Sequence, residues 1–373
     1  MSENTKTTAA TDASPQQRNR TSSEPLMQVQ GLTKHFPIKG GFPIKRVVGA
    51  VQAVDDVSLD IYPAESLGLV GESGCGKSTT GRLLTRLLEP TGGKISYQGR
   101  DITHASRKQL APIRSEIQMI FQDPYASLNP RQTVGTIISS PMEINGINPT
   151  GGREKRVREL MEFVGLNPEH FNRFPHEFSG GQRQRIGVAR ALALEPKLIV
   201  ADEPVSALDV SIQAQVVNLL QDLQRDLGIA FVFIAHDLAV VRHFSQRVAV
   251  MYLGKVVEVA DRDSLYNRPR HPYTHALLSA VPEVDVDGDK KERIRLAGDV
   301  PSPIAPPSGC RFRTRCWKAQ DKCATEAPPL VQLDGNRDGH LTACHFPEDP
   351  STEARAEDIV LDPALAALED EQK

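Results

Sequence analysis

Short apolar runs and longer amphipathic stretches alternate along residues 26–265. The runs at 66–70, 197–201 and 230–235 are mostly apolar, and each predicts a buried strand. Residues 210–227 instead repeat apolar side chains at helical spacing, with Gln and Asp opposite, which predicts a helix packed on a sheet. The apolar face of that helix consists of Ile212, Val216, Leu219, Leu220, Leu223 and Leu227. Strands that alternate with helices in this way are typical of an α/β fold with a mostly parallel sheet.

The other segments have different patterns. Residues 123–178 are rich in Pro and Asn at first and then become charged and helical, which predicts a helical subdomain inserted into the α/β domain. Residues 266–346 are Pro-rich and contain cysteines, so we expect a small loop-rich accessory domain that needs a cross-link to stabilise its fold. Residues 1–25 are too polar to form a core, and residues 347–373 carry nine acidic residues, so we expect two disordered tails.

Composition narrows the class of protein. A chain of 373 residues predicts about two domains, and 39% hydrophobic with 24% charged residues is ordinary for a soluble globular protein. The net charge of −3 and the lack of a dense basic stripe give no reason to expect a nucleic-acid partner. The apolar run at 229–235 is shorter than the roughly 18 residues that span a bilayer. The first residues also lack the apolar region of a secretory signal, so we expect a cytoplasmic location.

The sequence GESGCGKST at 71–79 directly follows the predicted strand at 66–70 and has the spacing of a phosphate-binding loop. Its glycines let successive backbone N–H groups surround phosphates, Lys77 neutralises the β and γ oxygens, and Ser78 offers a hydroxyl to Mg²⁺. A structural glycine turn is the alternative. The candidate nucleotide-binding residues are Gly71, Ser73, Gly74, Cys75, Gly76, Lys77, Ser78 and Thr79.

Polar residues follow three of the predicted strands. Asp202 and Glu203 end the strand in KLIVADEP, where parallel sheets bind ligands at their carboxyl edge. We predict that Asp202 lies near the water shell of the metal and that Glu203 orients and polarises an attacking water, although acids here also cap helices. We expect Gln122, in IFQDP, to complete the Mg²⁺ shell and His236, in IAHD, to donate to the γ-phosphate; taken alone, each is an ordinary loop residue. Asp209, in SALD, closes the loop after the acid pair.

A second anion site is predicted at EFSGGQRQR, residues 177–185. Ser179 suits the N-cap of a helix, and Gly180 and Gly181 leave the first amide groups accessible next to Gln182. The start of such a helix attracts anions because its free N–H groups and its dipole both point outward.

The order of these pieces resembles the nucleotide-binding subunits of ABC transporters, over residues 26–265. The resemblance implies an ATPase in which the SGGQ helix closes over ATP bound to the loop of a partner subunit, in a head-to-tail dimer with two ATP molecules. It also implies that Phe36 stacks on adenine, with Phe42 as a rival; a buried core phenylalanine is the alternative.

Three further stretches resemble the second ATPase subunit of oligopeptide and dipeptide importers: FQDPYASLNPR (121–131), RHPYTHALLSAVP (270–282) and GCRFRTRC (309–316). This resemblance implies a peripheral protein at the cytoplasmic face of the membrane. Its implied partners are a homologous ATPase subunit, identical or related, two permease subunits and an extracytoplasmic peptide-binding protein. A nickel importer or a non-transport ABC ATPase of DNA maintenance is the alternative; the latter usually carries long coiled coils, for which no heptad run is found here.

Cys310, Cys316, Cys323 and Cys344 fall in one loop-rich segment. Stable disulfides are not expected in a cytosolic protein, so four thiols close in sequence indicate a metal centre. The intervals between them are not those of a zinc knuckle, which makes a zinc site less favoured. The resemblance to peptide-importer ATPases implies a [4Fe–4S] cluster held by these four thiolates, with zinc or unliganded thiols as alternatives.

Overall fold

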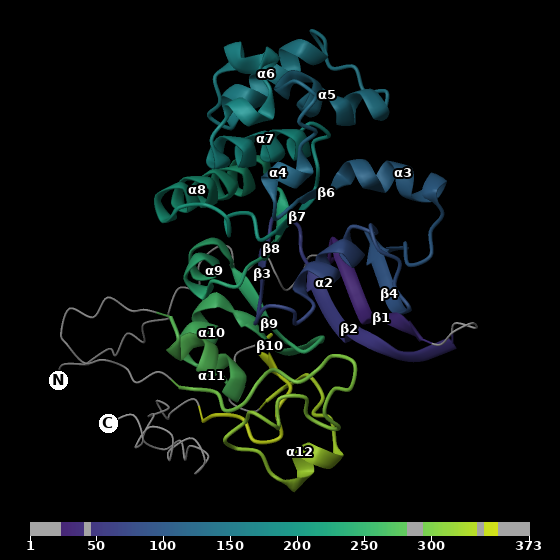
Figure 1. Ribbon diagram of the computed structural model, residues 1–373, viewed down its shortest axis with the longest axis vertical. Coiled ribbons are helices and arrows are strands. Elements are labelled where there is room, and N and C mark those ends of the chain that lie inside the picture. Colours follow the sequence, from purple (N-terminus) through teal and green to yellow (C-terminus); the bar gives the residue numbers. More distant parts are fainter. Residues whose placement is uncertain (1–23, 41–45, 282–293, 334–338, 350–373) are drawn as a thin grey trace, which may run out of the picture.

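The computed structural model describes residues 24–40, 46–281, 294–333 and 339–349. Their strands form two sheets, one of eight strands in the order β11-β12-β10-β9-β3-β8-β7-β6 and one of four strands in the order β2-β1-β4-β5. Figure 1 shows the helical part at the top, the four-stranded sheet at the right and the C-terminal segment at the bottom.

The larger sheet contains the three predicted strands, as β3 (Ser66–Val70), β7 (Leu198–Asp202) and β8 (Ala230–Ile234). They run parallel to one another and to their neighbours β6 (Ile117–Ile120) and β9 (Arg247–Tyr252). The predicted α/β fold with a mostly parallel sheet is therefore confirmed. Beyond β9 the sheet becomes antiparallel, through β10 (Lys255–Asp261), β12 (Leu341–Thr342) and β11 (Val331–Gln332).

The core lies on both faces of this sheet. Along β8, Phe231 and Phe233 belong to one cluster of buried residues, whereas Val232 and Ile234 belong to another. Successive side chains of a strand point to opposite faces, so a strand that is apolar at every position must be covered on both sides. This explains why β3, β7 and β8 read as continuous apolar runs.

Helices connect these strands and cover the sheet. The predicted helix at 210–227 is α8 (Val210–Leu227), in which Val216, Leu220 and Leu223 are buried as expected but Leu227 is exposed. The other helices of the α/β part are α2 (Lys77–Leu84), α3 (Arg107–Glu116), α9 (Leu238–Phe244), α10 (Arg262–Asn267) and α11 (Pro272–Ser279).

The smaller sheet is antiparallel and begins the described chain. Its two long strands β1 (Met27–Gly40) and β2 (Arg46–Ile61) pair along most of their length, and β4 (Gly92–Tyr97) and β5 (Arg100–Asp101) follow on the other side of β1. Leu32, Val54 and Val57 on its inner face are fully buried, because this sheet packs against the larger one through a shared core cluster.

The predicted helical insert contains mainly helices. These are α4 (Pro124–Ser127), α5 (Val134–Ile144), α6 (Arg153–Phe163) and two short 3-10 helices, η1 (Pro168–Asn172) and η2 (Pro175–Glu177). They are followed by α7 (Gly180–Leu192), which packs against α5 and α6 on one side and α8 on the other. The charged stretch from Gly152 to Gly165 corresponds to α6.

The C-terminal segment has little regular structure apart from α12 (Asp321–Thr325) and the two short strands β11 and β12. The expectation of a separate small domain is not supported, because β12 pairs with β10 in the main sheet and Phe312 lies in the main core cluster at 1% exposure. The segment is thus built onto the α/β body and shares its core.

The predicted tails fall mostly outside the described residues. The described start of the acidic tail is anchored, since Lys318 donates to the Pro347 carbonyl and to the Glu348 carboxylate, each at 3.1 Å. Within the described residues, no helix combines the length and hydropathy needed to cross a membrane.

Candidate functional site

The phosphate loop connects β3 to α2, as its sequence predicts. Gly76 adopts a φ of +105°, and a Cβ there would lie 2.0 Å from the Ala53 carbonyl oxygen. Gly71 has a φ of +151°, and a Cβ there would lie 2.1 Å from the Met251 carbonyl oxygen. Both positions therefore require glycine, because any side chain would push the loop away from the strands that support it.

The two polar side chains that end the loop have defined partners. Lys77 is buried, and its ammonium donates to the carbonyls of Gly71 at 2.7 Å and Glu72 at 2.9 Å. The Ser78 hydroxyl donates to an Asp202 carboxylate oxygen at 2.7 Å. Burial raises the pKa of Asp202, although the Ser78 hydrogen bond acts in the opposite direction. A cation held here would offset that cost of burying the carboxylate.

Glu203 lies between Gln122 and His236, as their places at the ends of neighbouring strands predict. The Gln122 amide donates to a Glu203 carboxylate oxygen at 2.8 Å, and His236 Nδ1 is 3.6 Å from the same oxygen. Glu203 has a φ of 44°, a left-handed conformation that costs free energy for a residue with a side chain. Glu203 and His236 also line a cavity with Gln213 and Asp237.

Ser179 is the N-cap of α7, and it forms a reciprocal capping box with Gln182. The Ser179 hydroxyl accepts from the Gln182 N–H at 3.3 Å, and the Gln182 side chain accepts from the Ser179 N–H at 3.0 Å. The Ser179 and Gln182 side chains are exposed, whereas Gly181 is buried. The capping box confirms the predicted capped helix.

Asp209 is the N-cap residue of α8. Its neighbour Leu208 is 3.3 Å from where a Cβ would stand on Gly180, and Ile212 is 2.4 Å from the same point on Gly181. The glycines of the SGGQ sequence therefore allow α7 and α8 to approach closely. The Asp209 side chain is exposed and forms no capping bond to α8.

Phe36 lies on β1 opposite Val51, and its side chain is 37% exposed. The Lys34 ammonium is 5.2 Å from the centre of its ring. The exposed ring is therefore free to stack on a planar group, unlike a core phenylalanine. The rival Phe42 lies outside the described residues.

The four C-terminal cysteines line one cavity. Cys310, Cys316, Cys323 and Cys344 surround it together with His271 and Phe312, and all four are free thiols. Burial, and the nearness of the other thiols, raise the pKa of Cys316 and Cys344 to about 12. Within the described residues, no group of three or more His, Cys, Asp or Glu side chains is arranged to hold a metal ion.

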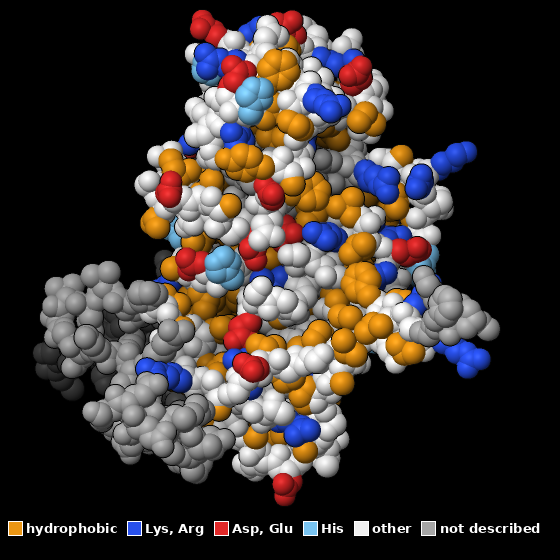
Figure 2. All heavy atoms as spheres, viewed as in Figure 1, with side chains coloured by type: hydrophobic (Ala, Val, Ile, Leu, Met, Phe, Trp, Pro, Cys, Tyr) orange, Lys and Arg blue, Asp and Glu red, His pale blue; other side chains and the backbone are white. Residues whose placement is uncertain are grey.

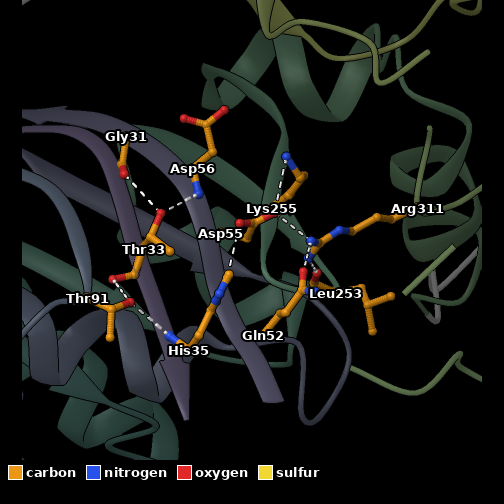
Figure 3. A network of polar contacts seen from close by, with 10 residues as sticks. All are labelled: Gly31, Thr33, His35, Gln52, Asp55, Asp56, Thr91, Leu253, Lys255 and Arg311. Atoms are coloured by element: carbon orange, nitrogen blue, oxygen red, sulfur yellow. Dashed lines mark hydrogen bonds and ion pairs between the residues drawn. The ribbon is translucent and has the colours of Figure 1, made fainter. Parts of the chain in front are cut away.

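Sequence reasoning missed two arginines of the C-terminal segment. Arg315 forms a two-pronged ion pair with Glu72 in the phosphate loop. Arg311 reaches β2, where it donates to Gln52 and Asp55, as well as to the Leu253 carbonyl (Figure 3). Burial would raise the pKa of Asp55, but the positive charges of Arg311 and Lys255 hold it below its usual value. In the sequence these arginines read as a short basic run, with no signal of their partners.

Comparison with known proteins decides the family. Residues 54–206 match the family described as ABC transporter, and residues 257–323 match the one described as oligopeptide/dipeptide transporter, C-terminal region. The oligopeptide transport ATP-binding protein AppF of Bacillus subtilis is 51% identical over 325 residues, which cover 87% of this chain and 98% of AppF. The chain belongs to the ABC transporter ATP-binding proteins. Within them it belongs to the oligopeptide and dipeptide transporter group, and it is an ATPase.

Other ABC transporter ATP-binding proteins are similar to it. The probable peptide ABC transporter ATP-binding protein y4tS of Sinorhizobium fredii is 52% identical over 323 residues, or 87% of this chain and 90% of that protein. A dimeric structure of the ATP-binding cassette MJ0796, bound to ADP and Pi, aligns with a TM-score of 0.56 at 29% identity, covering 63% of this chain and 98% of that one. The structure of cbiO1 from Clostridium perfringens aligns with the same TM-score at 26% identity, covering 65% and 90%.

Proposed function

We propose that this ATPase powers the import of di- and oligopeptides across the cytoplasmic membrane. The observation that carries the proposal is the meeting of Gln122, Glu203 and His236 at the carboxyl edge of the sheet, next to a glycine-dependent phosphate loop. The C-terminal family match and the peptide transport proteins among the relatives support the peptide as the transported solute.

The loop and the edge of the sheet have separate roles in this proposal. The amides of residues 74–79 and the Lys77 ammonium hold the phosphates, and Phe36 stacks on the adenine. Ser78 and Gln122 would ligate Mg²⁺ directly and Asp202 through water, and the ion would neutralise charge on the phosphates. Glu203 orients the attacking water and polarises it, and His236 donates to the γ-phosphate.

The site is complete only in a dimer. We propose that the start of α7, with Ser179, Gly181 and Gln182, closes over ATP held by the loop of a facing ATPase subunit. Amide groups aimed at the γ-phosphate stabilise the charge of the transition state, and they arrive only when the two subunits close. Hydrolysis is thereby coupled to movement of the subunits.

A Glu203→Gln variant tests the assignment of Glu203. The amide keeps the shape of the side chain but is a poor proton acceptor, so we expect ATP binding close to that of the wild type and a loss of turnover of roughly a hundredfold or more. Exposed Glu169 on η1 provides the matched control, because Glu169→Gln changes the same charge elsewhere. Near-normal turnover of the Glu203 variant would remove Glu203 from this role.

We further propose that the protein is bound at the cytoplasmic face of the membrane by two permease subunits that receive peptides from an extracytoplasmic binding protein. Cells that lack this chain are expected to lose uptake of a labelled tripeptide and to regain it with the wild-type chain, but not with the Glu203→Gln variant. If cells that lack this chain keep peptide uptake but lose nickel uptake, peptides are not the transported solute, although the chain can still be an ATPase.

We also propose that residues 26–265 act as the nucleotide-binding domain, with residues 123–178 as its helical subdomain, and that residues 266–346 act as an accessory region. Cys310, Cys316, Cys323 and Cys344 would hold a [4Fe–4S] cluster in that region, with zinc as the second choice. The shared cavity supports the cluster, because burial disfavours the thiolate forms of Cys316 and Cys344 and a bound metal centre would stabilise those thiolates. Such a cluster would staple the loops together.

Metal analysis of anaerobically purified protein tests the cluster. We expect about four iron and four sulfide per chain, and a brown colour that is lost in a Cys316→Ala variant. One zinc per chain would favour the alternative, and a colourless protein without iron or zinc would contradict both.

A further inference from the structure

The side chains of residues 310–316 contact two different parts of the molecule. The two cysteines line the cysteine cavity, whereas Arg311 and Arg315, which lie between them in the sequence, extend to the nucleotide-binding part of the chain. Phe312 anchors this stretch, because it is 1% exposed and its ring centre lies 5.2 Å from that of Tyr252 and 5.3 Å from that of Tyr273. The backbone that carries both arginines is therefore fixed against the core.

Arg315 holds the Glu72 side chain with two hydrogen bonds. Its two terminal nitrogens donate to the two carboxylate oxygens at 2.7 and 3.1 Å. The Arg315 side chain is 8% exposed and that of Glu72 is 27% exposed, so this pair is more strongly shielded from water than an ordinary surface pair. A planar guanidinium fits a carboxylate in this way, and a lysine cannot reproduce the geometry.

The backbone of Glu72 is held from two further directions. Its N–H donates to the buried Tyr273 hydroxyl at 2.9 Å, so a second residue of the C-terminal segment contacts the loop. Its carbonyl accepts from the Lys77 ammonium at 2.9 Å and from the Cys75 N–H at 3.3 Å. Glu72 thus connects the C-terminal segment to the lysine that would neutralise the phosphates.

We propose that Arg315 is a positioning residue for ATP binding: it fixes Glu72, and through Glu72 the phosphate loop, and it neutralises a carboxylate that would repel phosphates. The proposal rests on the proposed ATP site in that loop. Arg315 touches neither the reacting atoms nor Lys77. Apart from its electrostatic contact with the Tyr252 hydroxyl, its polar partner is Glu72, so most of its effect on ATP binding should disappear when Glu72 carries no charge.

The test measures ATP affinity and steady-state kinetics of full-length protein for Arg315→Gln, Arg315→Lys, Glu72→Gln and the double variant. Removing one member of a shielded ion pair leaves the other unpaired, so we expect Arg315→Gln to weaken ATP binding roughly 5- to 30-fold. The loss should appear in KM with little change in kcat, since Glu203 is untouched. Arg315→Lys should recover part of the affinity, because it keeps the charge and loses the two-pronged geometry.

The double variant Glu72→Gln/Arg315→Gln separates this role from general damage to the segment. With no charge left on Glu72, we expect its affinity to exceed that of Arg315→Gln alone, a non-additive result. Arg268→Gln is the matched control, because it removes the same charge from an exposed side chain elsewhere in the C-terminal segment. Should Arg315→Gln fail to fold, Arg315→Lys replaces it in the same double-mutant cycle with Glu72→Gln.

Three outcomes would overturn the proposal: wild-type affinity in Arg315→Gln, an equal loss in Arg268→Gln, or strictly additive effects in the double variant. The Lys77→Ala variant distinguishes failure of the positioning role from failure of the proposed ATP site. If Lys77→Ala abolishes ATP binding while Arg315→Gln leaves it unchanged, the positioning role is wrong and the ATP site stands. If Lys77→Ala binds ATP as the wild type does, the proposed ATP site itself is wrong.

Discussion

Replacing Phe312 with alanine measures how firmly the C-terminal segment is joined to the ATPase core. The Phe312 side chain is buried in the main core cluster, and its ring stands nearly perpendicular to that of Tyr252, at 84°. The segment around it has few helices or strands of its own, so this ring is a principal apolar contact between the segment and the body. Its truncation should therefore loosen the segment as well as destabilise the protein.

The magnitude follows from the burial. Truncating a fully buried phenylalanine to alanine costs about 3–5 kcal/mol, which includes the lost transfer free energy and the cavity that remains. Two aromatic neighbours each contribute about 0.5–1.5 kcal/mol beyond simple burial, which places this site in the upper half of that range. We expect the free energy of unfolding to fall by about 4 kcal/mol.

Urea unfolding followed by two probes measures the effect. Trp317, the single tryptophan of the chain, lies in the C-terminal segment and packs against the main core, so its fluorescence reports this segment. Circular dichroism at the helix band reports the α/β body. We expect the two transitions to coincide in the wild type, and in Phe312→Ala we expect the fluorescence transition to shift to lower urea by at least as much as the other.

Two results would refute this reasoning. A loss below about 1 kcal/mol would mean that Phe312 is not a packed core residue. A fluorescence transition well before the circular dichroism transition in the wild type would mean that the segment folds as an independent unit. Val300→Ala is the control, since Val300 is 44% exposed in the same segment and should change stability by no more than about 0.5 kcal/mol.

Two further predictions concern the phosphate loop. Burial raises the pKa of Cys75, and only the thiolate form reacts with iodoacetamide. The alkylation rate of Cys75, followed by peptide mass mapping, should therefore increase about tenfold between pH 7 and pH 8, and ATP should slow it. A rate that does not change with pH would contradict this. Gly76→Ala should weaken ATP binding at least tenfold, because its Cβ would meet the Ala53 carbonyl. Gly74→Ala should do less harm, since a Cβ there meets nothing within 4 Å; equal losses would show that φ alone matters.

The parallel sheet and its ligand edge could be predicted because their signals are local. Each buried strand is a continuous apolar run, and Asp202, Glu203 and His236 directly follow such runs. Parallel strands end at the same edge, so the meeting of Gln122 with Glu203 follows from topology once the strands are known. The capping box of Ser179 and Gln182 is likewise encoded within four residues.

The attachment of the C-terminal segment could not be predicted in the same way. Arg315 and Glu72 are separated by 243 positions, and Arg311 and Asp55 by 256. Nothing in a run of arginines indicates which of many carboxylates each one meets, and a segment poor in helices and strands gives no periodic pattern that marks its buried face. The expectation of a separate small domain is not supported, because the segment does not need a core of its own when Phe312 enters the main one.

The attachment of the C-terminal segment connects the cysteine cavity to the phosphate loop, which are far apart in the sequence. On the face shown in Figure 2, hydrophobic side chains gather where the C-terminal segment meets the rest of the molecule, and charged side chains of both signs surround them. The stretch from Cys310 to Cys316 lies at this junction, with cysteines on the cavity and arginines on Asp55 and Glu72. A shift of the backbone at the cavity must move both arginines, because Phe312 leaves the stretch little freedom. Removal of the proposed cluster is therefore expected to weaken ATP binding in the wild type, and to have a smaller effect once Glu72 is replaced by glutamine.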